Sequence, residues 1–191
     1  MIEVVKTEIP GVLIIEPKVF GDDRGYFMES FNAREFAEKT GVDITFVQDN
    51  ESKSRFGVLR GLHFQLPPYS QSKLVRVVKG KVLDVAVDIR KGSPTYGKYV
   101  TCEMTEENKR QFFVPKGFAH GFCVLSDEAI FQYKCDDFYH PEAEGAIAWD
   151  DPDVAIQWPL VAEKLILSEK DKHHPNLKDF DSPFDINVNL Y

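Results

Sequence analysis

The chain has 191 residues, of which 43% are hydrophobic, and it carries a formal net charge of −8. This length and composition can bury a core, and we expect residues 1–191 to form a single domain. An acidic chain lacks the basic face that a nucleic-acid partner requires, so none is expected. No stretch is apolar over the length that spans a bilayer, and no basic and apolar leader is present. We therefore expect neither a membrane association nor a signal peptide.

The three cysteines, Cys102, Cys123 and Cys135, lack the spacing of a metal-binding or redox motif. An odd number without a CxxC pair is typical of reduced, packed thiols and not of a disulfide framework. The cysteine pattern therefore predicts a cytoplasmic protein.

The N-terminal region is expected to contain extended segments joined by a turn. Residues 11–17 carry a run of apolar residues that predicts a strand. A turn follows at residues 21–23, and residues 26–31 then alternate large and polar side chains. These strands, within about residues 1–31, are the segment that a dimer could exchange.

A single short helix is predicted after residue 31. Asn32 suits the N-cap, Glu35 lies at the third helical position, and Gly41 supplies the C-terminal stop. Phe31 and Phe36 flank the cap at the spacing of a hydrophobic staple. This helix is expected to be structural.

From Ile44 onward the sequence predicts mainly strands separated by glycine and proline turns. Residues 44–52 are expected to start as a strand and to end in a polar exit. Further strands are predicted at residues 58–65, 72–80, 81–90, 96–104, 110–115, 119–125 and 129–137. Many short strands of this kind indicate an all-β sandwich or barrel. Residues 168–171 resemble the start of a short helix, and residues 172–191 are expected to form an irregular surface tail.

The stretch from Val58 to Lys73 concentrates the polar residues with chemical potential. His63 and Gln65 would share one face of a regular strand, and Arg60 would point to the other face. A bulge at Gly61 would bring Arg60 to the same face as His63. Such a face, with Lys73 on the next strand, suits an anionic ligand and a proton transfer. The alternative is a sheet edge that merely carries polar residues.

Two segments resemble the motifs of the cupin superfamily, which forms small jelly-roll barrels. In the first, Gly57 precedes His63, and Gln65 occupies the place of a second histidine. The second is the P-x-G-x-x-H pattern at residues 115–120, which ends in His120. The glutamate of metal-binding cupins is absent, and two imidazoles alone are a poor site for iron, manganese or zinc. We therefore expect a cupin barrel without a metal or other cofactor, in which His120 lines the pocket or contacts the ligand.

A more specific resemblance covers nearly the whole chain up to residue 171. The sequence is similar to the dTDP-4-dehydrorhamnose 3,5-epimerase family of sugar-nucleotide enzymes. The matching stretches are residues 22–31, 46–54, 57–97, 114–125, 133–139, 141–152 and 167–171. The resemblance implies an isomerase with a cupin-type jelly roll, a short N-terminal helix and small C-terminal helical segments. It also implies a homodimer that exchanges N-terminal strands, and a dTDP-4-keto-6-deoxy sugar as substrate.

The family's reaction implies roles for four residues. C3 and C5 of the sugar adjoin the C4 ketone, so their protons are acidic and inversion proceeds through an enolate. His63 suits the base, Asp171 would orient it, Tyr133 suits the acid on the opposite face, and Lys73 would stabilise the enolate oxygen. Three of these residues also have a plainer interpretation. Ser168-x-x-Asp171 also matches a helix cap, Tyr133 also fits a packed strand aromatic, and Lys73 also fits an exposed strand lysine.

The same resemblance implies a set of substrate-binding residues. Arg24 and Arg60 match positions near the diphosphate, where a guanidinium group forms bidentate contacts. Asp84 could support the site from behind. The remaining matches around the nucleotide and sugar are Phe27, Glu29, Gln48, Asp49 (through its backbone), Asn50, Tyr139, Glu144 and Lys170.

Other functions remain open at this point. A relative that inverts only C3 or only C5, or that serves another deoxysugar pathway, would share the same acid–base residues. A metal-dependent cupin is disfavoured by the missing ligands. A non-catalytic, sugar-binding cupin is disfavoured because His63, Lys73, Tyr133 and Asp171 occur together.

Overall fold

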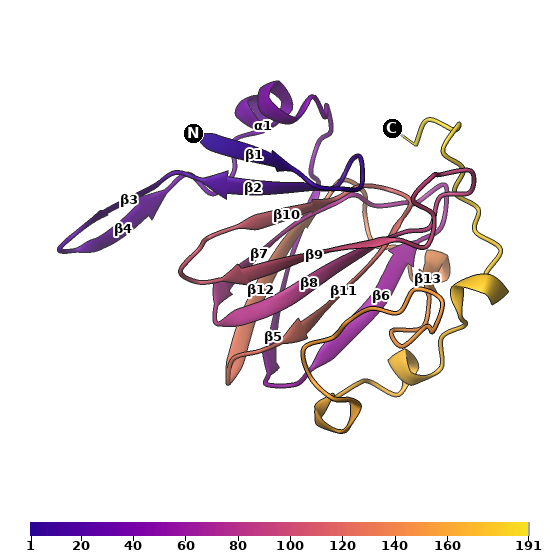
Figure 1. The fold of residues 1–191 in the computed structure, drawn as a ribbon. Coiled ribbons are helices and arrows are strands. Elements are labelled where there is room, and N and C mark those ends of the chain that lie inside the picture. Colours follow the sequence, from indigo (N-terminus) through magenta and orange to yellow (C-terminus); the bar gives the residue numbers. More distant parts are fainter. Residues whose placement is uncertain (191) are drawn as a thin grey trace.

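The computed structural model describes residues 1–190, and Tyr191, the end of the predicted tail, lies outside the described residues. Two larger antiparallel sheets face each other, and a two-stranded hairpin extends away from them (Figure 1). The six-stranded sheet has the order β1 (Ile2–Lys6), β2 (Leu13–Pro17), β10 (Gln111–Val114), β7 (Lys73–Lys79), β12 (Glu128–Cys135) and β5 (Gln48–Arg55). The five-stranded sheet has the order β13 (Glu144–Ala146), β6 (Leu59–Gln65), β11 (Phe118–Val124), β8 (Lys81–Asp88) and β9 (Tyr99–Thr105). The predicted all-β jelly-roll class is confirmed.

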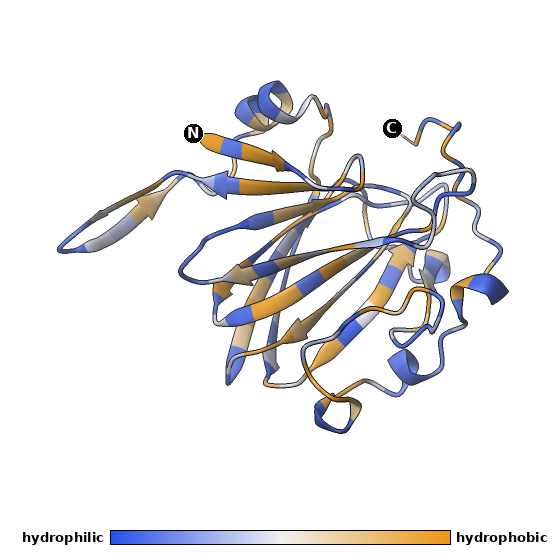
Figure 2. Ribbon diagram, in the orientation of Figure 1, coloured by the Kyte–Doolittle hydropathy of each residue, from blue (hydrophilic) through white to orange (hydrophobic). Residues whose placement is uncertain are grey.

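The main core lies between the two sheets. Phe122 of β11 stacks on Phe131 of β12, with ring centroids 4.2 Å apart, and so joins one sheet to the other. Val75 and Val82 are fully buried in the same cluster. Side chains alternate between the two faces of a strand, so the residues that flank each core position point to the outer face of the sheet. Hydrophilic segments interrupt the otherwise hydrophobic β6 and β8 (Figure 2), and these polar positions include site residues.

The outer face of the five-stranded sheet is covered by the C-terminal segment. Leu62 and Val85 on this face pack with Leu177 and Phe184, and Phe184 has no exposed surface. The prediction of a surface tail at residues 172–191 is therefore wrong for these side chains, although the segment is irregular as expected. The sheet needs an apolar cover on its second face, and a few apolar residues in a polar segment supply it.

The outer face of the six-stranded sheet carries the helix α1 (Ala33–Thr40). The Asn32 side chain accepts a hydrogen bond of 3.1 Å from the backbone N–H of Glu35, and Gly41 adopts a left-handed conformation with φ of 74°. Phe31 and Phe36 contact each other at 5.9 Å between centroids, as the staple predicted. The cap, the stop and the staple are confirmed. Phe36 then packs on Phe113 of β10, which fixes the helix to the sheet.

One strand lies later in the sequence than predicted. Residues 44–52 were expected to start as a strand and to leave it at the polar residues, but β5 is the polar segment Gln48–Arg55. Ile44 and Phe46 instead pack beside α1 in an irregular segment. β5 lies at the edge of its sheet, and its alternate side chains face solvent. Backbone hydrogen bonds to β12, and not apolar side chains, set its register. The short strands β1, β3 and β13 were not predicted, and β3 includes Gly21 and Asp22 of the expected turn.

The hairpin consists of β3 (Val19–Asp22) and β4 (Gly25–Met28), which pair only with each other. Most of its residues are exposed, including Phe20, Tyr26 and Phe27, whose exposed fractions are 52%, 57% and 70%. Figure 1 shows it as an arm beside the N-terminus. Within residues 1–190, no helix is long and apolar enough to cross a membrane.

Candidate active site

A cavity of about 300 Å³ opens between the two sheets and collects about half of the polar residues singled out in the sequence. His63 and Gln65 of β6 and Glu144 of β13 line it from the five-stranded sheet. Its other lining residues are Gln48, Asn50, Phe64, Gln71, Lys73, Tyr133 and Tyr139. His63 therefore faces Tyr133 and Lys73 from the opposite sheet.

A bulge at Gly61 brings Arg60 to the same face of β6 as His63, as predicted. His63 pairs with His120 and Arg60 pairs with Phe122, so two residues of β6 lie opposite one residue of β11. Gly61 has a φ of 131°, and a Cβ there would lie only 2.6 Å from the Cα of Gly121. Only glycine permits this close approach of the two strands.

His63 and Asp171 form a tight pair at the cavity wall. The Nε2 atom of His63 lies 2.5 Å from Oδ1 of Asp171, which is buried. Ser168 accepts a hydrogen bond from the backbone N–H of Asp171 and donates one of 2.9 Å to its Oδ2. Both interpretations of this motif have support, because Ser168 bonds the backbone N–H of Asp171 at the start of the 3-10 helix Lys170–Lys172, whose N-cap residue is Glu169, and also fixes the carboxylate that meets His63.

The Asp171 carboxylate is held in its ionised form. Burial would raise its pKa, but hydrogen bonds from His63, Ser168 and His174 outweigh it, and the pKa is lowered. His174 Nε2 lies 3.3 Å from the same Oδ1 atom, and its ring meets that of His63 edge-on. The sequence reasoning missed His174. The spacing of three residues from Asp171 across a short helical turn was the only signal for it.

Lys73 and Tyr133 occupy the wall opposite His63. The ammonium group of Lys73 lies 5.9 Å from the centre of the Tyr133 ring. Burial lowers the pKa of Lys73, and nearby anionic groups, including Asp84, counteract this only in part. Burial also raises the pKa of Tyr133, which keeps the phenol protonated. The opposite wall therefore provides a proton donor and a weakly solvated cation.

His120 and Asp84 form a second histidine–carboxylate pair behind the cavity. Nε2 of His120 lies 2.8 Å from Oδ1 of Asp84, and both residues are buried. Burial raises the pKa of Asp84, and its Oδ2 atom has no hydrogen-bond partner within residues 1–190. His120 does not line the cavity, so it lies behind the wall and is held there by Asp84.

The metal ligands of a cupin do not fit this site. Gln65 stands in place of one ligand, and its amide donates to the carbonyls of Tyr69 and Phe138 while its oxygen accepts from the N–H of His140. His63 and His120 are each paired with a different carboxylate. Each of these candidate ligands is thus engaged by another group, and the cupin set of metal ligands is not assembled here.

Some of the residues expected near the nucleotide lie at the cavity, and the others lie elsewhere in the fold. Gln48, Asn50, Tyr139 and Glu144 line the cavity, and Lys170 forms an ion pair with Glu144 at its edge. The side chain of Gln48 accepts from the backbone N–H of Tyr139 at 3.0 Å, which ties β5 to the following loop.

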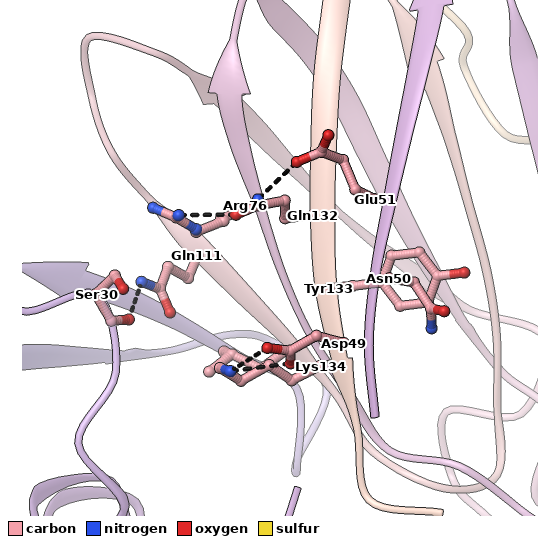
Figure 3. A pocket seen from close by; sticks show the side chains of 10 residues that line it. Ser30, Asp49, Asn50, Glu51, Arg76, Gln111, Gln132, Tyr133 and Lys134 are labelled. Atoms are coloured by element: carbon pink, nitrogen blue, oxygen red, sulfur yellow. Dashed lines mark hydrogen bonds and ion pairs between the residues drawn. The ribbon is translucent and has the colours of Figure 1, made fainter. Parts of the chain in front are cut away.

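Asp49 lies on the other face of β5. Its carboxylate pairs with Lys134 at 2.9 Å on the outer side of the six-stranded sheet. This side holds a separate polar cavity of about 260 Å³, in which Arg76 bonds Gln132 (Figure 3). Figure 3 shows the side chains of Asn50 and Tyr133 directed away from these residues, on the far side of the strands.

Arg24, Phe27 and Glu29 do not reach the cavity of their own chain. Arg24 at the hairpin tip pairs with Asp22 at 2.5 Å, and Glu29 lies 3.8 Å from the N-terminal amine. Arg60 lies on the same face of β6 as His63 and donates a hydrogen bond of 3.2 Å to Ser54. The structure thus brings the catalytic candidates together but leaves the hairpin residues apart.

Comparison with known sequences identifies one family. The family model for dTDP-4-dehydrorhamnose 3,5-epimerase matches residues 6–179. A dTDP-4-dehydrorhamnose 3,5-epimerase of Shigella flexneri is 59% identical over 178 residues, which cover 93% of this chain and 97% of the relative.

Solved structures show the same relationship. A dTDP-6-deoxy-D-glucose-3,5-epimerase of Legionella pneumophila, in complex with dTDP-4-keto-L-rhamnose, matches with a TM-score of 0.91 at 53% identity. The match covers 95% of each chain. A dTDP-4-dehydrorhamnose 3,5-epimerase of Elizabethkingia anophelis matches with a TM-score of 0.89 at 52% identity, over 93% of this chain and 97% of the other.

Proposed function

The chain belongs to the dTDP-4-dehydrorhamnose 3,5-epimerase family, and on this basis we propose how its own residues perform the reaction. Its activity is the 3,5-epimerisation that leads from dTDP-4-dehydro-6-deoxy-D-glucose to dTDP-4-dehydro-L-rhamnose in dTDP-rhamnose biosynthesis. Each inversion removes a proton next to the C4 ketone and returns one to the other face of the sugar. The site must therefore supply a base, an acid and a partner for the enolate oxygen.

His63 is the proposed base. Its Nε2 atom is bonded to Asp171, so Nδ1 is the nitrogen left to take up the sugar proton. The ionised Asp171 holds the ring in this tautomer and stabilises the imidazolium that forms. The short contact between these two side chains at the cavity wall is the single observation that carries the proposal.

Tyr133 is the proposed acid and Lys73 the proposed partner of the enolate. They belong to the sheet opposite His63, so a sugar ring in the cavity would present one face to the base and the other to the phenol. The Lys73 ammonium beside Tyr133 would stabilise negative charge on the C4 oxygen, and burial strengthens this interaction.

The nucleotide would extend from the sugar along residues that match the family. We propose that Arg60 contacts the diphosphate and that Gln48, Asn50, Tyr139, Glu144 and Lys170 surround the nucleoside and sugar. Asp49 could contribute only its backbone, because its side chain lies on the other face of β5. His120, held by Asp84, would support the wall near Lys73.

The hairpin β3–β4 is proposed to complete the site of a second copy in a homodimer. An isolated two-stranded hairpin is marginally stable in water, and an arm that exposes several aromatics favours a partner surface. Arg24, Phe27 and Glu29 match substrate-binding positions yet lie away from the cavity of their own chain. We further propose that residues 1–191 act as one domain in this dimer.

The chemistry is proposed to require no metal or other cofactor, because His63 and Tyr133 can exchange the protons and Lys73 can bear the charge. Activity should therefore survive EDTA treatment. Activity that a chelator abolishes and one divalent ion restores would contradict this.

The experiment that tests the proposed function is solvent exchange in deuterated water with dTDP-4-keto-6-deoxyglucose. The wild-type protein should place deuterium at both C3 and C5, which NMR locates. His63→Ala should abolish exchange at both positions and leave dTDP binding intact. A variant that still exchanged at the wild-type rate would exclude His63 as the base.

A further inference from the structure

Two histidines converge on one oxygen of Asp171. His63 Nε2 and His174 Nε2 lie 2.5 Å and 3.3 Å from Oδ1, and the three potential ligand atoms lie within 4.8 Å of one another. Among the described residues this is the one group of three or more His, Cys, Asp or Glu side chains close enough to hold a metal ion. Two imidazoles and a carboxylate are the ligand set of several zinc sites that keep one position open.

The distances from the two imidazole nitrogens to the carboxylate oxygen can be compared with those of a tetrahedral zinc site. With bonds of about 2.0 Å, neighbouring ligand atoms in such a site lie about 3.3 Å apart. The His174–Asp171 distance already matches, and the His63 ring needs to withdraw from Oδ1 by less than about 1 Å. His63 lines the cavity, so the fourth position would open on it and could take water.

The surroundings also suit a metal. Ser168 binds Oδ2 of Asp171 and leaves Oδ1 directed at the two rings, as an outer hydrogen bond fixes a ligating carboxylate. Asp171 is buried and His174 is partly buried, so an ion held between them would be shielded from solvent on the protein side.

We propose that His63, Asp171 and His174 form an inhibitory zinc site. Zinc would take the Nε2 lone pair of His63, and the single proton of the neutral ring would then reside on Nδ1 in place of Nε2. With Nε2 bound to the metal and Nδ1 protonated, neither ring nitrogen can accept the sugar proton, so proton removal stops. The inhibition rests on the proposed role of His63, whereas the metal binding does not.

His174→Gln tests the site, with His173→Gln as the matched control. Glutamine keeps a donor toward Asp171 but loses the imidazole nitrogen, and His173 is an exposed histidine next in the chain. Protein treated with EDTA and dialysed would be titrated with Co²⁺, whose visible absorption reports a four- or five-coordinate site, and then with Zn²⁺ in competition. The wild type and His173→Gln should bind one ion with the same affinity. His174→Gln should bind at least about tenfold more weakly.

Epimerase assays in buffered Zn²⁺ complete the test, with each protein normalised to its own metal-free activity. The zinc concentration for half inhibition should rise in His174→Gln by the factor seen in the Co²⁺ titration, and should not change in His173→Gln. Equal binding by wild type and His174→Gln, or binding without inhibition, would overturn the proposal. Metal-free activity of the wild type reports the proposed function separately, and the Co²⁺ titration needs no substrate.

Discussion

The Nε2 atom of His63 lies 2.5 Å from Oδ1 of Asp171, a residue 108 positions later in the chain. The histidine belongs to β6, the second strand of the five-stranded sheet, and the carboxylate belongs to a 3-10 helix of the C-terminal segment. The base and the group that orients it are thus supplied by separate parts of the fold.

Asp171→Asn should lower solvent exchange at both C3 and C5, by less than His63→Ala does. The amide keeps the size of the side chain but cannot stabilise the imidazolium, and general-base catalysis of this kind is worth about 10²–10⁴-fold. Exchange is measured by NMR in deuterated water, and dTDP affinity by calorimetry. Ser168→Ala is the control for the cap and should cost about 1 kcal/mol of stability with a smaller effect on exchange. Equal exchange in Asp171→Asn and wild type would show that His63 needs no carboxylate.

Tyr133→Phe should separate proton removal from inversion. The variant keeps the ring but lacks the hydroxyl, so His63 can still abstract a proton while delivery to the opposite face fails. Deuterium should therefore enter with retained configuration while net epimerisation falls by about 10²-fold or more. NMR of the recovered sugar nucleotide distinguishes the two outcomes. Epimerisation at the wild-type rate would assign the donor to water or to another side chain.

The pH dependence of kcat should reflect the deprotonation of Lys73 at alkaline pH. Burial lowers the pKa of Lys73. As the pH rises, Lys73 therefore loses its positive charge earlier than an exposed lysine, whose pKa is about 10.4. Because the charge stabilises the enolate, kcat should decline as the pH rises through this lowered pKa. Burial raises the pKa of Tyr133, so loss of the phenol proton occurs at higher pH and does not explain the decline.

Lys73→Arg is the variant that checks this assignment. A guanidinium group keeps its charge beyond about pH 12, so the alkaline limb of the kcat profile should move to higher pH even if kcat itself is reduced. An unchanged limb would assign the decline to another group.

Phe27→Asp should weaken the proposed dimer. The side chain is 70% exposed on β4, and a charge there would oppose burial against a partner. Sedimentation velocity should show a shift to monomer, with weaker dTDP binding because the hairpin no longer reaches the second site. Val188→Asp, at a 57% exposed valine of the tail, is the control and should remain dimeric. Removal of residues 1–31 is a poorer test, since it would also remove β1 and β2 from the six-stranded sheet. A monomeric, fully active wild type would contradict the proposal.

Local signals were sufficient where the structure depends on neighbouring residues. Asn32 and Gly41 predicted both ends of α1, because a cap and a left-handed stop act within one turn. Gly61 predicted the bulge that brings Arg60 to the same face of β6 as His63, because a bulge changes the face of the residues beyond it. The family resemblance supplied His63 and Asp171 as a pair, which no spacing along the chain could have provided.

Contacts between distant segments were beyond the local signals. The polar strand β5 is held by its ladder to β12, and the sequence of Gln48–Arg55 alone does not show this. Phe184 covers the back of a sheet, which its polar neighbours concealed. His174 could be placed beside His63 only once the position of Asp171 was known.

The C-terminal segment has a consequence for synthesis of the protein. Leu177 and Phe184 anchor it to the back of the sheet that carries His63, and Asp171 lies just before these anchors. A chain that ended before residue 177 would leave the apolar back of that sheet uncovered and the segment that carries Asp171 without its anchors. The carboxylate reaches His63 only when the last apolar residues of the chain have docked, so completion of synthesis is a condition for activity.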